Sequence, residues 1–233
     1  MKSESPKMFD RISGRYDCLN HFLSARQDIR WRRKAAAQFK NQADQTILDL
    51  ATGTGDLILT GFERKPSFVK GIGIDPAEGM LRIAQKKIHD KHLSARIQLV
   101  RGDGIAIPLA AGSVDGVMIA FGIRNIDDFK LGLQETLRVL NIGGRLVVLE
   151  FSLPESSLLR KMYLLYFRHI LTWLGGIFSG DKEAYKYLIE TVENFYYGEE
   201  FCEKMKEAGF GKVHRIPLTL GIATIYIGDR GTV

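Results

Sequence analysis

D-L-A-T-G-T-G-D, residues 49–56, follows an apolar run at 46–48 and is the stretch that decides the fold. The run has the β-branched and aliphatic composition of a buried strand. Gly53 and Gly55 then allow a tight turn in which the backbone can approach a ligand closely. A dinucleotide-binding turn would need a third glycine where Ile58 stands. The stretch therefore indicates a strand and a turn, and an ordinary βα connection is the alternative to a ligand site.

Charge narrows the ligand that this turn could bind. Asp49 and Asp56 place a carboxylate at each end of the turn. Two negative charges repel a pyrophosphate but attract an ammonium or sulfonium group. The turn therefore favours S-adenosylmethionine over NAD, FAD or ATP, and its candidate cofactor-binding residues are Asp49, Gly53, Thr54 and Gly55.

Length and composition bound the class of protein. The chain has 233 residues, 45% of them hydrophobic, and a formal net charge of +6. Its length is sufficient for one α/β domain with an attached lid and a sizeable core. The amino-terminal residues lack the apolar core of a secretory signal. Cys18 and Cys202 lie far apart and are expected to be reduced thiols of a cytoplasmic protein. The modest basic excess is compatible with nucleic acid, with an anionic membrane surface or with neither.

Strand and helix patterns alternate along the chain. Buried strands are predicted at 46–50, 68–74, 97–100, 114–121 and 145–151. Helices are predicted at 76–89, with Pro76 in the first turn, and at 127–140, where Gly143-Gly144 ends the helix. This alternation predicts a Rossmann-like, mostly parallel sheet with helices on both faces.

The remaining segments complete a single domain over residues 1–233. Two late strands, 212–217 and 222–227, are expected to form an antiparallel hairpin at the sheet edge, which makes seven strands in all. Residues 1–45 are expected to form an N-terminal helical cover, and residues 152–198 a helical substrate lid.

Two more acids follow the second and third predicted strands, where an open α/β sheet binds its ligand. Asp75 could accept both hydroxyls of a ribose, and its alternative role is a helix N-cap. Asp103, followed by Gly104, could accept from an adenine amino group, and its alternative is a turn aspartate. Acids at the ends of three successive strands, the first beside a glycine turn, favour S-adenosylmethionine as the cofactor.

Three longer segments carry family signatures. They are Y-D-C-L-N-H-F-L-S at 16–24, F-G-I-R-N at 121–125 and R-V-L-N-I-G-G-R-L-V-V-L-E-F-S at 138–152. With these segments the chain resembles the class I methyltransferases and, within them, the quinone-biosynthesis C-methyltransferases. The resemblance covers nearly the whole chain. It implies methyl transfer to a ring carbon of demethylmenaquinol or of 2-polyprenyl-6-methoxy-1,4-benzoquinol.

A few residues depart from the family pattern. Ala51 replaces the first glycine of D-x-G-x-G-x-G, which is a small-for-small change. Asn141 and Ile142 replace the usual Lys-Pro, a change expected to affect a helix end rather than the chemistry.

The resemblance also implies the roles of the catalytic residues. Arg124 and Asn125 follow the fourth strand, which neighbours the first in the family fold. Arg124 would stabilise a phenolate and Asn125 would orient it, while a water takes the proton. The alternative is that Arg124 pairs with a carboxylate of the lid. His169 could be a base or a core residue, and Tyr16 would lie near the methionine moiety of the cofactor. The five histidines show no metal-ligand spacing, so no metal is expected.

The segment at 158–178 is apolar and aromatic but is interrupted by basic residues. Its charges argue against a transmembrane span. It is suited to binding a polyprenyl tail and to peripheral contact with a membrane surface. Trp31 and its basic neighbours could also contact anionic head groups. The alternatives are packing on the core or on a second subunit of a homodimer.

Two other classes of function compete with a quinol methyltransferase. One is a methyltransferase for another small molecule or for nucleic acid. However, the fourth strand is not followed by N/D-P-P-Y/F and no basic arm interleaved with aromatic residues is evident, so no nucleic-acid partner is expected. The other is a non-catalytic binding protein, against which Arg124 and Asn125 argue.

Overall fold

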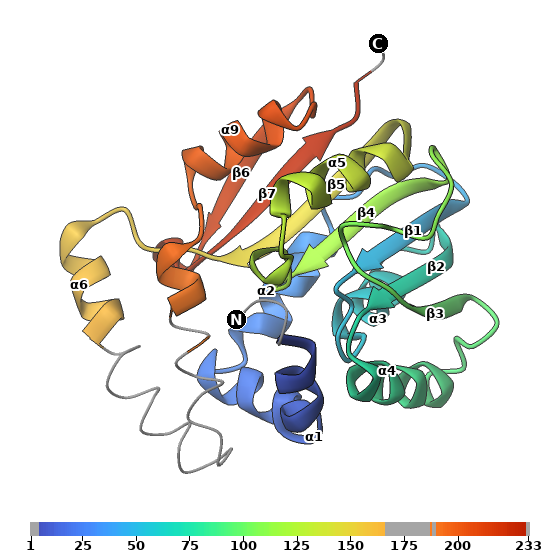
Figure 1. Ribbon diagram of the computed structural model, residues 1–233, viewed down its shortest axis with the longest axis horizontal. Coiled ribbons are helices and arrows are strands. Elements are labelled where there is room, and N and C mark those ends of the chain that lie inside the picture. The colour runs from blue at the N-terminus through green and yellow to red at the C-terminus, as the bar shows by residue number, and fades with distance from the viewer. Residues whose placement is uncertain (1–4, 166–186, 188–189, 232–233) are drawn as a thin grey trace.

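A seven-stranded sheet forms the centre of the computed structural model, with strand order β3-β2-β1-β4-β5-β7-β6 (Figure 1). The structure describes residues 5–165, 187 and 190–231, with only the backbone for residues 5, 15, 16, 18–20, 22 and 23. The first five strands pair in parallel, and β7 pairs antiparallel with both β5 and β6. The strands are β1 Gln45–Leu50, β2 Phe68–Asp75, β3 Ile97–Arg101, β4 Val114–Ala120, β5 Leu140–Phe151, β6 Val213–Leu218 and β7 Ala223–Asp229. The predicted mostly parallel sheet with an antiparallel edge is confirmed.

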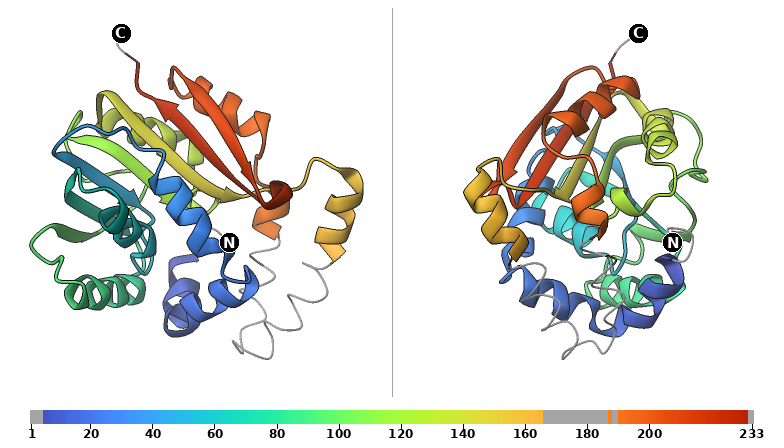
Figure 2. Two further views of the ribbon diagram at one scale, coloured as in Figure 1. Left: turned by 180° about the vertical axis from the view of Figure 1, so that it is seen from behind. Right: turned by 60° about the vertical axis from the view of Figure 1, so that its left-hand side comes forward.

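Helices cover both faces of the sheet because successive strand residues point to opposite sides (Figure 2). Val117 and Ile119 of β4 join a core that includes residues of α5 and α9. Met118 joins the other core, with Trp31 of α2 and Leu57 of α3. The described helices are α1 Ser5–Leu23, α2 Gln27–Ala36, α3 Asp56–Arg64, α4 Glu78–Asp90, η2 Ile123–Asn125, α5 Phe129–Val139, α6 Ser157–Leu165, α9 Glu199–Glu207 and η4 Thr219–Gly221.

The start of α4 differs from the sequence prediction. Pro76 lies before the helix rather than in its first turn, and the N-cap residue is Ala77 in an extended conformation. The N–H of Ala77 donates to Oδ1 of Asp75 at 2.9 Å. Asp75 therefore holds the connection between β2 and α4 but is not itself the N-cap.

The predicted role of Gly143-Gly144 as a helix stop is wrong. The helix α5 ends at Val139 and β5 begins at the next residue, so both glycines lie inside the strand. Gly143 has φ +78°, and a Cβ on Gly144 would lie 2.8 Å from the carbonyl oxygen of Asn141. The pairing of β4 with β5 shifts register in this region. The glycines therefore permit an irregular start of the strand.

Helices precede the sheet as predicted for residues 1–45. The helix α1 packs against α4, and α2 packs against α3. Trp31 is buried, and its Nε1–H donates to Oγ1 of Thr219 at 2.9 Å, so it belongs to the core rather than to a surface.

The predicted lid is described only in part. Residues 157–165 and 190–194 are helical, whereas 166–186 and 188–189 lie outside the described residues, and His169 lies among them. No helix in the described part of the chain is long and apolar enough to cross a membrane. The roles of cover and lid remain predictions.

Candidate functional site

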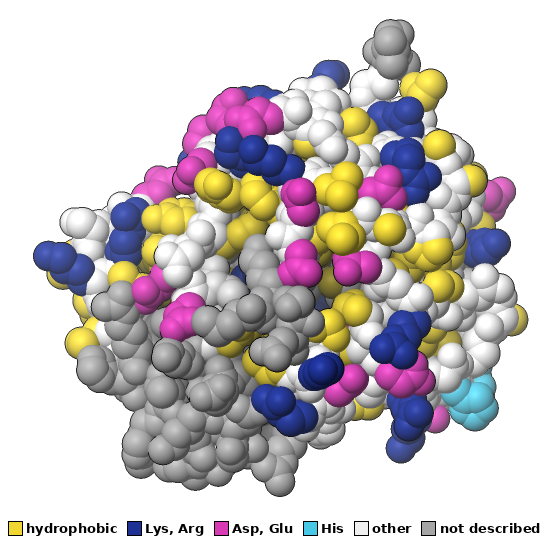
Figure 3. All heavy atoms as spheres, in the orientation of Figure 1, with side chains coloured by type: hydrophobic (Ala, Val, Ile, Leu, Met, Phe, Trp, Pro, Cys, Tyr) yellow, Lys and Arg dark blue, Asp and Glu magenta, His cyan; other side chains and the backbone are white. Residues whose placement is uncertain are grey.

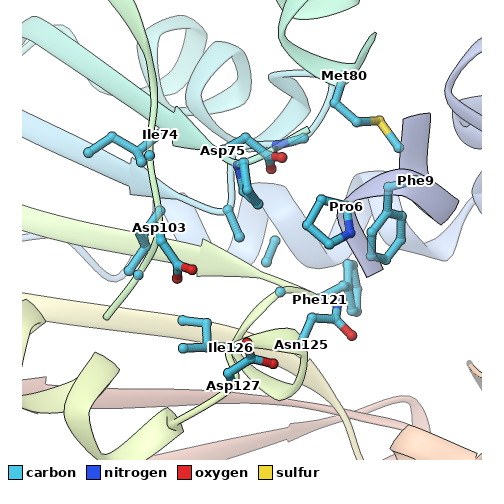
Figure 4. A pocket seen from close by; sticks show the side chains of 18 residues that line it. Pro6, Phe9, Ile74, Asp75, Met80, Asp103, Phe121, Asn125, Ile126 and Asp127 are labelled. Carbon is cyan, nitrogen blue, oxygen red and sulfur yellow. Dashed lines mark hydrogen bonds between the residues drawn. The ribbon is translucent and has the colours of Figure 1, made fainter. Parts of the chain in front are cut away.

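A cavity lies at the carboxyl ends of β1, β2 and β4 and beside the amino-terminal turns of α1. Figure 4 shows Asp75 at the end of β2, Asp103 after β3 and Asp127 after η2 around it, with Pro6 and Phe9 of α1 beyond them. The sheet brings Asp75 and Asp103 together because parallel strands present their carboxyl ends at the same edge.

Five of the predicted site residues line this cavity: Gly53, Asp75, Asp103, Gly104 and Asn125. Four others are within two residues of a lining residue in the sequence but do not line the cavity themselves: Asp49, Thr54, Gly55 and Arg124. The side chain of Tyr16 lies outside the described residues.

The glycine turn requires left-handed backbone at several positions. Gly53 has φ +55° and Gly55 has φ +82°, a region that L side chains avoid. A Cβ on Gly55 would also lie 3.2 Å from Cβ of Ala84. The N–H of Gly53 donates to Oδ2 of Asp75 at 2.8 Å, which ties the turn to the end of β2.

Gly122, which follows β4, leaves room for Ala51 of the turn. Ala51 has φ +55°, and a Cβ on Gly122 would lie 2.5 Å from Cβ of Ala51. Neither carbon can rotate away, because both are attached directly to the backbone. A methyl group therefore fits at only one of these two positions.

We expect Gly122→Ala to lower the free energy of unfolding by about 1–3 kcal/mol through overpacking. Adding Ala51→Gly removes the opposing methyl group and should restore most of that loss. Chemical denaturation of the two single variants and the double variant measures the coupling. A double variant no more stable than Gly122→Ala would show that this contact is not the cause.

Asp49 is buried at the end of β1 with an unsatisfied oxygen. Its Oδ2 accepts from the hydroxyl of Thr52 at 2.7 Å and from the N–H of Ile58 at 3.2 Å. Its Oδ1 has no partner among the described residues. Burial raises the pKa of Asp49 to about 7. A buried carboxylate with a free oxygen is costly, and a cationic group bound at the turn would offset that cost.

Among the described residues, each carboxylate oxygen of Asp75 accepts one hydrogen bond, from the N–H of Gly53 and from the N–H of Ala77. Burial raises its pKa to about 6. Each oxygen keeps a second lone pair for a ligand. The side chain can therefore accept further hydrogen bonds from a ligand in the cavity that it lines.

Asp103 and its neighbours form the side of the cavity after β3. One oxygen of Asp103 accepts from the N–H of Ile105 at 3.2 Å, so the turn role holds. A Cβ on Gly104 would lie 2.6 Å from Cδ1 of Ile126, which also lines the cavity.

Some lining residues were not predicted from the sequence. Ile126 and Asp127 are two of them, although both directly follow the Arg124-Asn125 motif. The apolar lining residues Pro6, Phe9, Ile74 and Met80 were also not predicted.

Arg124 forms a buried ion pair. Its Nη1 lies 2.6 Å from Oε1 of Glu150 and also donates to the carbonyl oxygen of Phe121 at 2.7 Å. The side chains of Arg124 and Glu150 are 5% and 1% exposed. Burial raises the pKa of the Glu150 carboxyl, and the charge of Arg124 opposes this. The alternative role of Arg124, pairing with a carboxylate, is therefore met, but this carboxylate belongs to β5 and not to the lid.

Arg124 and Glu150 each keep one polar atom without a hydrogen-bond partner. Nε of Arg124 and Oε2 of Glu150 have no partner among the described residues.

Asn125, next to Arg124, contacts a residue of the predicted lid. Oδ1 of Asn125 accepts from the hydroxyl of Tyr187 at 3.2 Å. The side chain of Asn125 is thereby oriented by a residue of the predicted lid.

No group of metal-ligating side chains occurs within the described part of the chain.

Comparisons with known proteins find relatives over nearly the whole chain. The model of the ubiE/COQ5 methyltransferase family matches residues 2–230. A demethylmenaquinone methyltransferase from Thermus thermophilus is 45% identical over 223 residues, covering 96% of this chain and 100% of the relative. A ubiquinone/menaquinone biosynthesis C-methyltransferase from Geobacter sulfurreducens is 43% identical, covering 96% of this chain and 87% of the relative.

Solved structures share the fold at low identity. A SAM-dependent methyltransferase from Thermotoga maritima has a TM-score of 0.68 at 21% identity, covering 96% of this chain and 98% of that chain. Another, from Aquifex aeolicus, has a TM-score of 0.61 at 18% identity, covering 85% of this chain and 89% of that chain.

Proposed function

This chain belongs to the ubiE/COQ5 methyltransferase family, and we propose that it transfers a methyl group from S-adenosylmethionine to a ring carbon of a prenylated quinol. Demethylmenaquinol and 2-polyprenyl-6-methoxy-1,4-benzoquinol are the two candidate acceptors. The observation that carries the proposal is the meeting of Asp75, Asp103 and Asn125 around one cavity beside the glycine turn. The names of the relatives from Thermus thermophilus and Geobacter sulfurreducens support a quinol as the acceptor.

The residues at the cavity fit S-adenosylmethionine. Asp75 would accept from the ribose hydroxyls, and Asp103 from the adenine amino group. Gly53 brings the backbone of the turn to the cavity, and the free Oδ1 of Asp49 lies buried behind that turn, where positive charge is favoured. Thr54 and Gly55 shape the turn, and Tyr16 would cover the methionine moiety. S-adenosylmethionine, when bound, supplies the methyl group as an electrophile.

The acceptor must be held and activated by residues after β4. Asn125 lines the cavity and would orient the quinol oxygen, with Tyr187 fixing the amide. Arg124 would stabilise the developing phenolate electrostatically, and a water would take the proton. Because Arg124 is paired with Glu150, direct contact with the oxygen requires the pair to open. The competing role of Arg124 is structural, as the partner of Glu150.

We further propose peripheral contact with the inner face of a membrane, where prenylated quinols partition. The helix α6 exposes Leu158, Met162 and Leu165 on one face, with exposed fractions of 67%, 60% and 63%. Such a surface could instead pack against a second copy of the chain. The protein would otherwise be cytoplasmic.

Nucleic acid is the less favoured acceptor. On the face drawn in Figure 3, Lys and Arg side chains are interspersed with Asp and Glu rather than gathered into one basic patch. A continuous basic surface is what binding to phosphates requires.

The proposal is tested by incubating the protein with methyl-labelled S-adenosylmethionine and each of the two reduced quinols in detergent. We expect label in the carbon-methylated quinone in at least one arm. Label transferred to neither quinol, by protein that methylates a different class of acceptor, would overturn the proposal.

Cofactor affinity should depend on pH through the two buried carboxyls. Burial raises the pKa of Asp49 to about 7 and of Asp75 to about 6, so both gain their negative charge between about pH 5 and 8. A cationic ligand binds the ionised form better, and the affinity should rise about tenfold or more over this range. The free protein should lose stability over the same rise, because folding favours the protonated carboxyls.

Calorimetric titration near pH 5.5 and 7.5 measures this effect. S-adenosylhomocysteine, which lacks the sulfonium charge, is the control and should show a shallower dependence. Equal slopes for the two ligands would rule out an interaction of the carboxyls with the sulfonium.

A further inference from the structure

A series of ionic contacts, made by residues that do not line the cavity, joins the N-terminal helices to the glycine turn. Lys87 of α4 lies at its centre, with Nζ 2.6 Å from Oδ2 of Asp17 in α1 and 2.6 Å from Oδ1 of Asp56, the first residue of α3. Asp17 also accepts, through Oδ1, from the hydroxyl of Thr54 at 2.6 Å. One ammonium group therefore connects α1 to the residues on both sides of Gly55.

The series of ionic contacts continues into α2. Nη2 of Arg32 lies 3.8 Å from Oδ2 of Asp56, and Nη1 of Arg32 pairs with Asp28. Oδ2 of Asp28 lies 2.7 Å from Nδ1 of His21, near the end of α1. Asp28 and Arg32 are buried. The contact between α1 and α2 thus involves the buried pair of Asp28 and Arg32. In contrast, the side chains of Lys87, Asp17 and Asp56 have exposed fractions of 28%, 27% and 22%.

The other end of α1 borders the cavity. Pro6 and Phe9 line it (Figure 4). Oδ1 of Asp10 accepts from the N–H of Gly79, in the first turn of α4, at 2.7 Å. Any ligand in the cavity therefore lies against a helix whose position depends on Asp10 and on the contacts of Asp17.

We propose that Lys87 is a positioning residue that fastens α1 over the cofactor and thereby sets how long the cofactor stays bound. The inference rests on the proposed use of this cavity for S-adenosylmethionine. Without the ammonium, Asp17 and Asp56 repel each other, and of the described contacts of Asp17 the hydrogen bond from Thr54 remains. Because these groups are partly exposed, the ion pairs of Lys87 with Asp17 and Asp56 can break in water, and salt weakens them.

The test uses the full chain and S-adenosylhomocysteine, so it does not depend on the identity of the methyl acceptor. In Lys87→Met we expect the dissociation rate of S-adenosylhomocysteine to rise about tenfold, with the association rate changed by less than about threefold. Lys87→Arg should restore the slow dissociation. The matched control is Lys91→Met, which removes a lysine at the end of the same helix that pairs with Glu63 at 2.8 Å and is 55% exposed; its rates should match those of the unmodified chain.

Two further readouts separate fastening from a general loss of structure. Raising the salt concentration should speed dissociation from the unmodified chain but have little effect on Lys87→Met. S-adenosylhomocysteine should protect the exposed Lys7 of α1 from trypsin in the unmodified chain and not in the variant. If Lys87→Met does not fold, Asp17→Asn is measured in the same way.

The outcomes distinguish this inference from the proposed function. Dissociation from Lys87→Met at the rate of Lys91→Met, in folded protein, would overturn the role of Lys87 while leaving the cofactor site intact. No binding of S-adenosylhomocysteine to the unmodified chain would overturn both this inference and the proposed cofactor site. Normal binding without quinol methylation would overturn the proposed acceptor alone.

Discussion

Replacing Asp75 with alanine is expected to weaken the binding of S-adenosylmethionine by two to three orders of magnitude. The carboxylate would accept from two ribose hydroxyls, and hydrogen bonds to a charged group are worth about 1.5–3 kcal/mol each. The same change removes the acceptors of the N–H groups of Gly53 and Ala77, so the glycine turn also loses its tie to β2. Both effects act in the same direction.

Isothermal titration of S-adenosylhomocysteine measures the loss for Asp75→Ala. Asp115→Ala is the matched control, because Asp115 also accepts from a backbone N–H, that of Thr46 at 2.8 Å, and from Asn141 at 2.7 Å. Asp115 lies at the start of β4, away from the cavity. Its variant should lose stability but keep its affinity. An affinity for Asp75→Ala within about threefold of the unmodified chain would refute the ribose role, given the energies above.

The sheet and the acidic strand ends could be predicted from the sequence because each depends on local pattern. Short apolar runs predicted β1 to β5, and parallel strands necessarily bring Asp75 and Asp103 to one edge. The register of β4 against β5, with Ala120 opposite Leu149, also places Arg124 and Glu150 near each other. The pairing with Glu150 was not predicted, because the alternative role of Arg124 named only a carboxylate of the lid.

Other features could not be predicted, because they depend on contacts between segments that are far apart in the sequence. The hydroxyl of Thr54 donates to Asp17 of α1, which is distant in the sequence. Thr54 therefore contacts the N-terminal cover and does not line the cavity. Pro6 and Phe9 line the cavity only because α1 packs against α4. Gly143 at the irregular start of β5 resembled a helix stop because glycine with positive φ is common in both settings.

The ion pair between Arg124 and Glu150 gives the second large effect. Glu150→Ala leaves a buried guanidinium without its counter-ion, and breaking a buried pair in this way costs about 3–5 kcal/mol of unfolding free energy. Denaturant titration measures it. Glu203→Ala is the control, because Glu203 pairs with Lys206 at 2.7 Å on the exposed surface of α9, where such pairs contribute less than about 1 kcal/mol.

Loss of stability alone does not separate a structural role of Arg124 from an activating one, and a double replacement does. Arg124→Met with Glu150→Leu removes both charges and keeps similar volumes, a change that is often neutral for stability. If Arg124 stabilises the phenolate, the double variant should fold and bind S-adenosylhomocysteine normally, yet turn over about 100- to 1000-fold more slowly. Turnover within about threefold of the unmodified chain, in equally stable protein, would assign Arg124 to structure alone, since lost electrostatic stabilisation of a transition state costs far more than that. Glu150 would then be its structural partner, and activation of the quinol would fall to Asn125 and the residues that hold it.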